Sequence, residues 1–142
     1  EINSSIKLKP VTKNDALFLY DLLKTRDPLA NISHKKMPSY DEHVNFILSN
    51  PYTIWYIIEY EGKKIGSIYL SKQDEIGIHF KEQNITNKIR SKVLKMIIKK
   101  NPHDRYLINI NPSNTMMKKF LKNEGFELIQ HTYEISKKTS SV

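Results

Sequence analysis

The sequence predicts an α+β domain built around one mixed central sheet. Three apolar segments between residues 54 and 80 follow one another with short turns, which is typical of an antiparallel meander. Apolar residues at helical spacing occur before and after this meander. A strand–helix–strand crossover over 75–80, 87–100 and 106–110 adds a parallel pair. The predicted order is β-α-α-β-β-β-α-β-α-β.

Capping signals define the two predicted helices that precede the meander. Residues 6–8 alternate between apolar and polar and predict a short first strand. Thr12 and Asp15 are spaced as in a capping box, and the helix that they open ends before residue 27. Ser39 and Glu42 form a cleaner capping box for a second helix, which an Asn-Pro pair stops.

The rest of the chain alternates strands and helices. Aromatic and β-branched residues fill 54–60, Glu61-Gly62-Lys63 predicts a hairpin turn, and the chain returns over 64–70. Gly125 suits the position that follows a helix C-terminus. The later elements are expected at these residues: a strand at 75–80, a helix at 87–100, a strand at 106–110, a helix at 115–123, a strand at 126–135 and a polar tail at 136–142.

Composition limits the class of protein. The 142 residues fit one domain, expected over 1–142 with its core at 6–135. A net charge of +8 favours acidic partners such as nucleic acid, an anionic surface or a phosphate-rich cofactor, although the lysines equally suit a solvated surface. The chain has no cysteine, and its histidines lack paired metal spacing, so no metal site is predicted. No apolar run approaches the ~20 residues of a membrane span, and no signal pattern opens the chain. We therefore expect no membrane partner and a cytoplasmic location.

The late part of the chain resembles the GNAT (Gcn5-related) N-acetyltransferases. The segment Tyr106–Ile110, then Asn114, one short helix and Gly125-Phe126 is similar to the late signature of that family. The order of elements matches over residues 6–135, and the start resembles the branches that acetylate ribosomal proteins and amino sugars. The resemblance implies a GNAT-like fold and acetyl-CoA as the cofactor. It also implies transfer of an acetyl group to a primary amine on a sugar nucleotide, a peptide N-terminus or a small metabolite, by a monomer or homodimer.

The family's phosphate-binding loop has the form Gln/Arg-x-x-Gly-x-Gly, and the glycine positions fall here on Thr86, Lys88 and Arg90. Glycines let a pyrophosphate approach the amides at a helix N-terminus. Two outcomes stay open at this point. Either the helix amides and the basic side chains hold phosphate by charge, or bulky side chains fill the site and coenzyme A is lost. The expected cofactor-binding residues are Ile78, Phe80, Thr86, Asn87, Lys88, Ile89, Arg90, Ser91 and Asn114.

Catalysis in this family is direct attack of an amine on a thioester, which needs a base and a polarised carbonyl. Glu75 is the expected base and His79 a second proton carrier; a strand-end carboxylate and a half-buried packing histidine are the competing interpretations. Backbone amides around Ile78 and Phe80 would polarise the carbonyl. Where many members have a donor tyrosine, seven residues after the motif Asn, this chain has Leu121.

Substrate is expected between the loop at 26–38, the helix at 39–49 and the sheet surface near Trp55 and Tyr56. His34, Lys35 and Lys36 are the polar candidates in that loop. A second hypothesis is a catalytically inactive GNAT-fold binding or accessory domain that has lost productive coenzyme binding. A nucleic-acid-binding domain is not favoured, because the sequence shows no recognition-helix pattern and no basic surface interleaved with aromatic residues.

Overall fold

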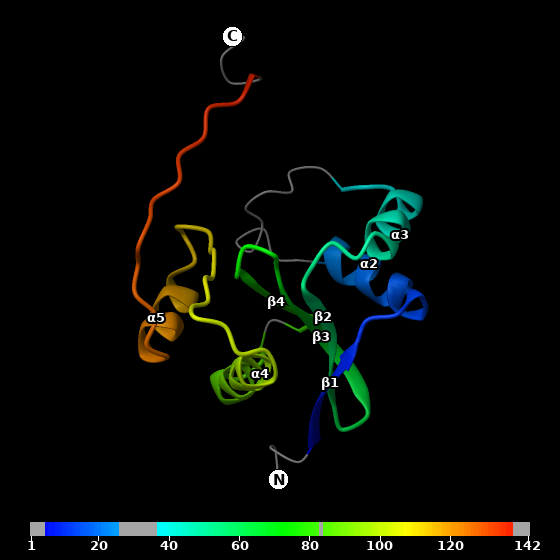
Figure 1. Ribbon diagram of the computed structural model, residues 1–142, viewed down its shortest axis with the longest axis horizontal. Helices are drawn as coiled ribbons and strands as arrows, with labels where there is room; N and C mark the ends of the chain where they lie inside the picture. The colour runs from blue at the N-terminus through cyan, green and yellow to red at the C-terminus, as the bar shows by residue number, and fades with distance from the viewer. Residues whose placement is uncertain (1–4, 26–36, 83, 138–142) are drawn as a thin grey trace.

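A computed structural model of the chain describes residues 5–25, 37–82 and 84–137 (Figure 1). Four strands form one sheet, and helices cover both of its faces. The elements are β1 (Ile6–Pro10), η1 (Lys13–Asp15), α2 (Ala16–Lys24), α3 (Tyr40–Leu48), β2 (Ile54–Tyr60), β3 (Lys63–Leu70), β4 (Ile76–Phe80), α4 (Asn87–Lys100) and α5 (Thr115–Asn123). The predicted α+β class and the order of elements up to α5 are confirmed, apart from the strand at 106–110.

The sheet is an antiparallel meander in the order β1-β2-β3-β4. Ile57 of β2 lies opposite Ser67 of β3, which lies opposite His79 of β4. The β2–β3 turn holds Glu61 and Gly62 at φ values of 51° and 78°, a left-handed pair that suits a tight hairpin. The predicted turn is therefore confirmed.

Alternation along the strands gives the sheet two apolar faces. Ile58, Ile68 and Ile76 point to one face and pack with residues of α4 and α5. Ile57 and Trp55 point to the other face and pack with α2 and α3. Figure 1 shows the resulting layers, with α2 and α3 on one side of the sheet and α4 and α5 on the other.

The predicted caps are present where the sequence indicated them. Ser39 N donates to Glu42 Oε1 (2.8 Å) and Glu42 N donates to Ser39 Oγ (3.1 Å), which closes a capping box at the start of α3. Thr12 N likewise donates to Asp15 Oδ2 (2.8 Å). This pair closes the 3₁₀ turn η1, whose last residue, Asp15, directly precedes α2.

The prediction of a full strand at 106–110 is wrong. Leu107 alone forms a parallel bridge with Glu75, through Ile76 N to Leu107 O (2.7 Å) and Leu107 N to Asp74 O (2.8 Å). No other backbone hydrogen bond joins this segment to β4 among the described residues. Asn109 instead donates its side-chain amide to Glu75 Oε2 (3.0 Å). The expected mixed sheet is thus antiparallel, with one parallel bridge at its edge.

The strand predicted at 126–135 is also wrong. Residues 127–135 are exposed, with Leu128 79% and Tyr133 91% accessible. Figure 1 shows this segment running away from the body after α5. Its sequence has the residue types of a strand, but a strand forms only where a neighbouring edge supplies its hydrogen bonds. No described segment lies alongside it as such an edge.

Candidate active site

The head of α4 is the expected anion-binding end. The helix begins at Asn87, and Thr86 caps it by accepting a hydrogen bond from Ile89 N at Oγ1 (3.3 Å). Thr86 and Lys88, which occupy two of the family's glycine positions, are both exposed. Neither side chain is packed into the core, and the Thr86 hydroxyl occupies one first-turn amide, that of Ile89. The first-turn amides and the positive end of the helix dipole together favour an anion there.

Arg90, at the third glycine position, was expected to be an accessible cation that binds phosphate, but its side chain is buried. It is only 9% exposed, and its Nη1 donates to Ile85 O (2.6 Å) and Asn87 Oδ1 (3.1 Å). The guanidinium lies 5.9 Å from the centre of the Phe80 ring. Burial lowers the pKa of Arg90, and no described carboxylate pairs with it. Arg90 thus adds a positive charge beneath the first turn of α4 and braces the residues that lead into it.

Three other expected cofactor residues have structural partners. Ile89 is buried in the core, and Ser91 Oγ donates to Glu124 Oε1 (2.9 Å) just after α5. Asn114 caps α5, since its Oδ1 accepts from Met117 N (3.2 Å). Leu121, at the position of the family's tyrosine, is buried in the core. These contacts favour capping and packing roles for this group; their binding roles stay predictions.

On the outer edge of β4 the backbone amides point away from β3. Lys81 N bonds to Ile65 O on the β3 side (2.8 Å), whereas Ile76 N bonds outward to Leu107 O (2.7 Å). Because successive residues of a strand point their amides to opposite sides, Ile78 and Phe80 also point outward. Beyond the bridge at Leu107 the two segments share no further backbone hydrogen bond among the described residues. The expected amide donors at Ile78 and Phe80 thus lie on an edge from which the neighbouring chain diverges.

The two expected proton carriers do not lie together. Glu75 and His79 are four residues apart on an extended chain, which separates their Cα atoms by about 13 Å. Glu75 accepts from Asn109 Nδ2 (3.0 Å) and lies 3.5 Å from Ser71 Oγ, beside the parallel bridge. His79 lies at the far end of β4 and lines a pocket on the face that α2 and α3 cover. The described contacts therefore tie Glu75 to the turn at the start of β4.

The pocket beside His79 has a cavity volume of about 260 Å³ and lies between α2, α3 and the sheet. Tyr52 stacks on Tyr69, with ring centroids 3.8 Å apart, and Trp55 meets Tyr52 edge-on at 4.9 Å. A Cβ on Gly77 would collide with the Tyr69 ring, so this glycine allows the ring to lie across β4. The lining residues are Leu19, Leu22, Leu23, Pro38, Glu42, His43, Phe46, Tyr52, Trp55, Ser67, Tyr69 and His79.

Sequence reasoning placed Trp55 at the substrate region and His79 among the proton carriers, and it missed Tyr52, Tyr69 and His43. The cross-strand row Trp55–Tyr69–Gly77 was the available signal, because a small residue opposite two aromatic residues marks a place where a ring crosses the strand. The expectation for Tyr56 is wrong, because this side chain points to the opposite face and packs in the core beneath α4. His34, Lys35 and Lys36, the expected substrate-loop residues, lie outside the described residues.

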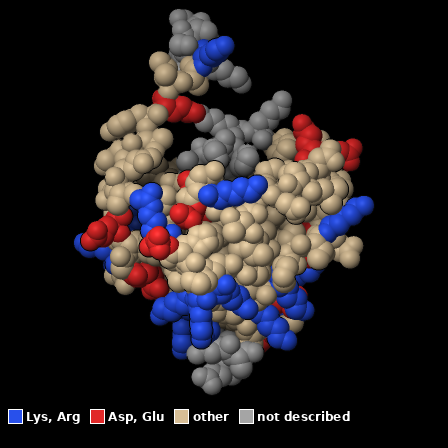
Figure 2. Space-filling view, viewed as in Figure 1, with Lys and Arg blue, Asp and Glu red and all other residues tan. Residues whose placement is uncertain are grey.

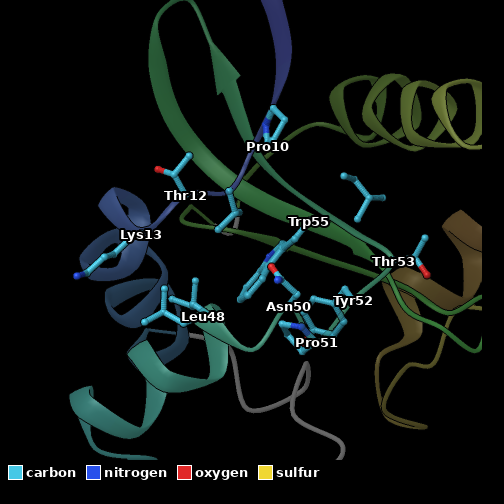
Figure 3. Close-up of a pocket in the computed structure, with 12 residues that line it drawn as sticks. Pro10, Thr12, Lys13, Leu48, Asn50, Pro51, Tyr52, Thr53 and Trp55 are labelled. Atoms are coloured by element: carbon cyan, nitrogen blue, oxygen red, sulfur yellow. The ribbon is translucent and has the colours of Figure 1, made fainter.

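A second hollow of about 350 Å³ lies behind Trp55, between the end of β1, the end of α3 and residues 50–55 (Figure 3). Figure 3 shows Asn50, Pro51 and Tyr52 grouped beneath Trp55, with Lys13 pointing away from the hollow. Its described lining contains no carboxylate, no histidine and no residue of β4. This hollow therefore lacks the proton carriers that the β4 pocket has.

Charge is distributed unevenly over the surface. On the face shown in Figure 2, Lys and Arg side chains gather along the edge where α4 and β1 lie. Lys88, Lys95, Lys99 and Lys100 are the exposed basic residues of α4. Among the described residues, no cluster of three or more His, Asp or Glu side chains could hold a metal ion, and no helix has the length and apolarity of a membrane span.

Neither a family model nor a curated protein matches the chain. Solved structures do match. The ribosomal alpha-N-protein acetyltransferase RimL in complex with coenzyme A aligns with a TM-score of 0.68 at 13% identity, over 92% of this chain and 84% of RimL. The spermidine/spermine N-acetyltransferase SpeG from Vibrio cholerae aligns at 0.70 and 13%, over 90% and 83%. FdhC, a nucleotide-linked sugar GNAT, aligns at 0.68 and 15%, over 94% and 84%.

These likenesses first define the class: the chain is an α+β domain with the architecture of an acetyltransferase. More particularly, it has the GNAT fold, as the late motif of the sequence implied. The resemblance in fold is thereby confirmed at identities too low to transfer a substrate.

Proposed function

We propose that this chain is an N-acetyltransferase that moves an acetyl group from acetyl-CoA to a primary amine. The observation that carries the proposal is the open outer edge of β4, which leads into the head of α4. Ile78 and Phe80 direct their amides to this edge, and the helix begins seven residues after Phe80, at Asn87. The chain thus supplies amide donors for the thioester carbonyl on β4 and, a few residues later, the helix end that would bind the phosphates.

The residues at the head of α4 fit the diphosphate of coenzyme A. Lys88 is exposed at the second helical position, and Arg90 adds a charge that no described carboxylate neutralises. Bound coenzyme would supply the acetyl thioester. The amides of Asn87 and Lys88 and the side chain of Lys88 would hold its phosphates by charge-assisted hydrogen bonds. Basic side chains thus take over part of the role that close glycine contacts have in the family.

On β4, the Ile78 amide would polarise the thioester carbonyl, and His79 would receive a proton from the amine. The neutral amine nitrogen would attack the carbonyl carbon, so that an N–C bond forms and the C–S bond breaks. The nitrogen loses one proton in forming the amide: His79 would accept this proton on an imidazole nitrogen and pass it to the departing sulfur, which leaves as the free thiol. Glu75 remains the alternative base, with its carboxylate placed by Asn109 at the other end of the strand.

Titration with coenzyme A tests the proposal. At 100 times its dissociation constant, a ligand that binds only the folded state adds about 2.7 kcal/mol to the free energy of unfolding. We expect such a stabilisation with coenzyme A and none with pantetheine, which lacks the diphosphate. Release of free thiol from acetyl-CoA with a panel of primary amines then tests transfer. No stabilisation at millimolar coenzyme A would overturn the proposal.

A catalytically inactive GNAT-fold domain is the second candidate, and the burial of Leu121 favours it. The position that carries a tyrosine donor in many members of the family packs here into the core, where an aliphatic side chain can donate no proton. Coenzyme binding without thiol release would support this candidate, whereas His79→Ala and Glu75→Gln variants with reduced turnover would exclude it.

A further inference from the structure

Helix α4 carries a stripe of lysines on the side that faces away from the core. At about 3.6 residues per turn, Lys88, Lys92, Lys95 and Lys99 fall within an arc of about 60° around the helix. Three of these side chains are exposed and Lys92 is half-buried, whereas the opposite side of the helix is buried in the core. We call these four residues the basic stripe.

The charges of the basic stripe are not balanced within the helix. None of the 14 residues of α4 is acidic, and no ion pair between described residues includes a stripe lysine. Neighbouring lysines of the stripe are three or four positions apart, a spacing at which like charges destabilise a helix. An ordinary solvated face mixes charges of both signs. An anionic partner lying along the stripe would relieve this repulsion.

The length of the basic stripe fits a row of phosphates. From Lys88 to Lys99 the stripe is about 16 Å long. One strand of a nucleic-acid duplex carries a phosphate about every 3.4 Å along its axis, so the stripe spans about five phosphates. Figure 2 shows further Lys and Arg side chains gathered along the edge where α4 and β1 lie, which extends the basic surface beside the stripe.

The residue types of the stripe favour phosphate over other anionic partners. Lysine binds phosphate as a point charge, whereas the fork of arginine suits planar carboxylates, and Arg90, the one arginine of α4, is buried. Protein–protein interfaces are depleted of lysine and enriched in aromatic residues, and α4 contains no aromatic residue. A membrane-binding helix inserts its apolar face, but the apolar face of α4 is covered by the core.

We propose that the basic stripe of α4 binds the phosphate backbone of duplex nucleic acid without regard to base sequence. Single strands are held largely by stacking of their bases on aromatic side chains, which α4 lacks, so the duplex is the better partner. Contact with phosphates alone needs neither a recognition helix nor interleaved aromatic residues. The surface goes beyond the proposed acetyl transfer, and Lys88 is the residue that it shares with the coenzyme site.

Fluorescence anisotropy with a labelled DNA duplex of mixed sequence tests the proposal in the absence of coenzyme A. The logarithm of the binding constant should fall linearly with the logarithm of the salt concentration. The expected slope is about −0.9 for each phosphate contact, or about −3.6 for four contacts. Single-stranded DNA, polyglutamate and vesicles that contain phosphatidylserine are titrated in the same way. We expect the duplex to bind most tightly.

Two triple variants separate the effect of the stripe from the effect of net charge. The stripe variant carries Lys92→Gln, Lys95→Gln and Lys99→Gln, and the control carries Lys118→Gln, Lys119→Gln and Lys122→Gln at exposed positions of α5. Both lose three positive charges, and thermal unfolding checks that both remain folded. We expect the salt slope of the stripe variant to be shallower by about 2.7 and the slope of the control to be unchanged.

A single change, Lys95→Gln, tests the same surface with less disturbance of the helix. The electrostatic contribution of one contact vanishes near about 1 M salt, so its loss should weaken duplex binding about eightfold at about 0.1 M salt. An unchanged affinity in this variant would overturn the proposal.

Equal salt slopes for the two triple variants would also overturn the proposal, because net charge and not the stripe would then determine binding. Tighter binding of single strands, polyglutamate or vesicles than of the duplex would refute the assignment of the partner. Duplex binding without stabilisation by coenzyme A would leave this proposal standing and refute the proposed function. Stabilisation by coenzyme A without duplex binding would do the reverse.

Discussion

Reversing the charge of Lys88 should change stability and coenzyme binding in opposite directions. Lys88 is exposed at the second position of α4, where the helix dipole favours negative charge. A Glu there stabilises the helix by about 0.3–1 kcal/mol. The same change removes one favourable charge pair with a bound diphosphate and creates one unfavourable pair. At about 0.2–1 kcal/mol for each exposed pair, coenzyme A should bind with a free energy weaker by about 0.5–2 kcal/mol. This is roughly 2- to 30-fold in Kd.

Lys99→Glu is the matched control. Lys99 is an exposed residue in the last turn of the same helix. It lies eleven residues beyond Lys88, or about 16 Å along the helix axis. This exceeds the Debye length of about 8–10 Å at 0.10–0.15 M salt, so its charge hardly reaches the phosphate. The change should lower stability, because a negative charge at the helix C-terminus is unfavourable, and leave the Kd unchanged.

The assays are calorimetric titration with coenzyme A at 0.10 M salt and thermal unfolding of each free variant. The expected pattern is higher stability with weaker binding for Lys88→Glu, and lower stability with unchanged binding for Lys99→Glu. Equal Kd values for the two variants would show that the head of α4 does not hold the diphosphate. Charge reversal at Arg90 is a poorer probe, because this side chain is buried and bonded to Ile85 O, so folding and binding would change together.

Three further predictions concern stability. Burial alone would raise the pKa of Asp15, but the hydrogen bond and charge of Lys64, at 2.8 Å, hold it below 3.8. Asp15→Asn should therefore lower the free energy of unfolding by about 1–3 kcal/mol at pH 7. The difference between the wild type and the variant, measured by urea unfolding, should shrink as the pH falls below 4; a difference that does not change with pH would contradict this. Burial lowers the pKa of His43 from 6.5, so the free energy of unfolding should fall as the pH drops below 6.5. His43→Gln should remove this pH dependence; an unchanged dependence in the variant would show that other groups cause it. Gly77→Ala should lower the free energy of unfolding, measured by chemical denaturation, by about 1–3 kcal/mol, because its Cβ meets the Tyr69 ring. Adding Tyr69→Leu to this variant should restore most of the lost stability; no recovery would show that the clash is not the cause.

Local signals in the sequence were sufficient to predict most of the helices. The Ser39–Glu42 capping box placed the start of α3, since a cap is a contact between residues three positions apart. The β2–β3 hairpin was equally local, because Gly62 marks its turn. These elements depend on neighbours in sequence and could be predicted without knowledge of the tertiary structure.

Features that depend on distant residues could not be predicted in the same way. The orientation of Arg90 depends on the Phe80 ring of β4, 5.9 Å from its guanidinium, as well as on the nearby carbonyl of Ile85. The aromatic pocket depends on cross-strand register, which brings Tyr69 over Gly77. The segment 126–135 has strand residues, but nothing in its own sequence states whether an edge lies beside it.

The missing strand at 106–110 and the proposed site on β4 have one cause. Had residues 106–110 paired along all of β4, the amides of Ile78 and Phe80 would have been consumed by that ladder. The chain bonds to β4 only at Leu107 and is then held through Asn109 by Glu75, which leaves the far end of β4 open. At that end the backbone faces the open edge, Ile78 and Phe80 direct their side chains to the core beneath α4, and His79 faces the aromatic pocket. In the proposed function this one strand presents its outer backbone edge to the cofactor, and it can do so only where residues 106–110 do not pair with it.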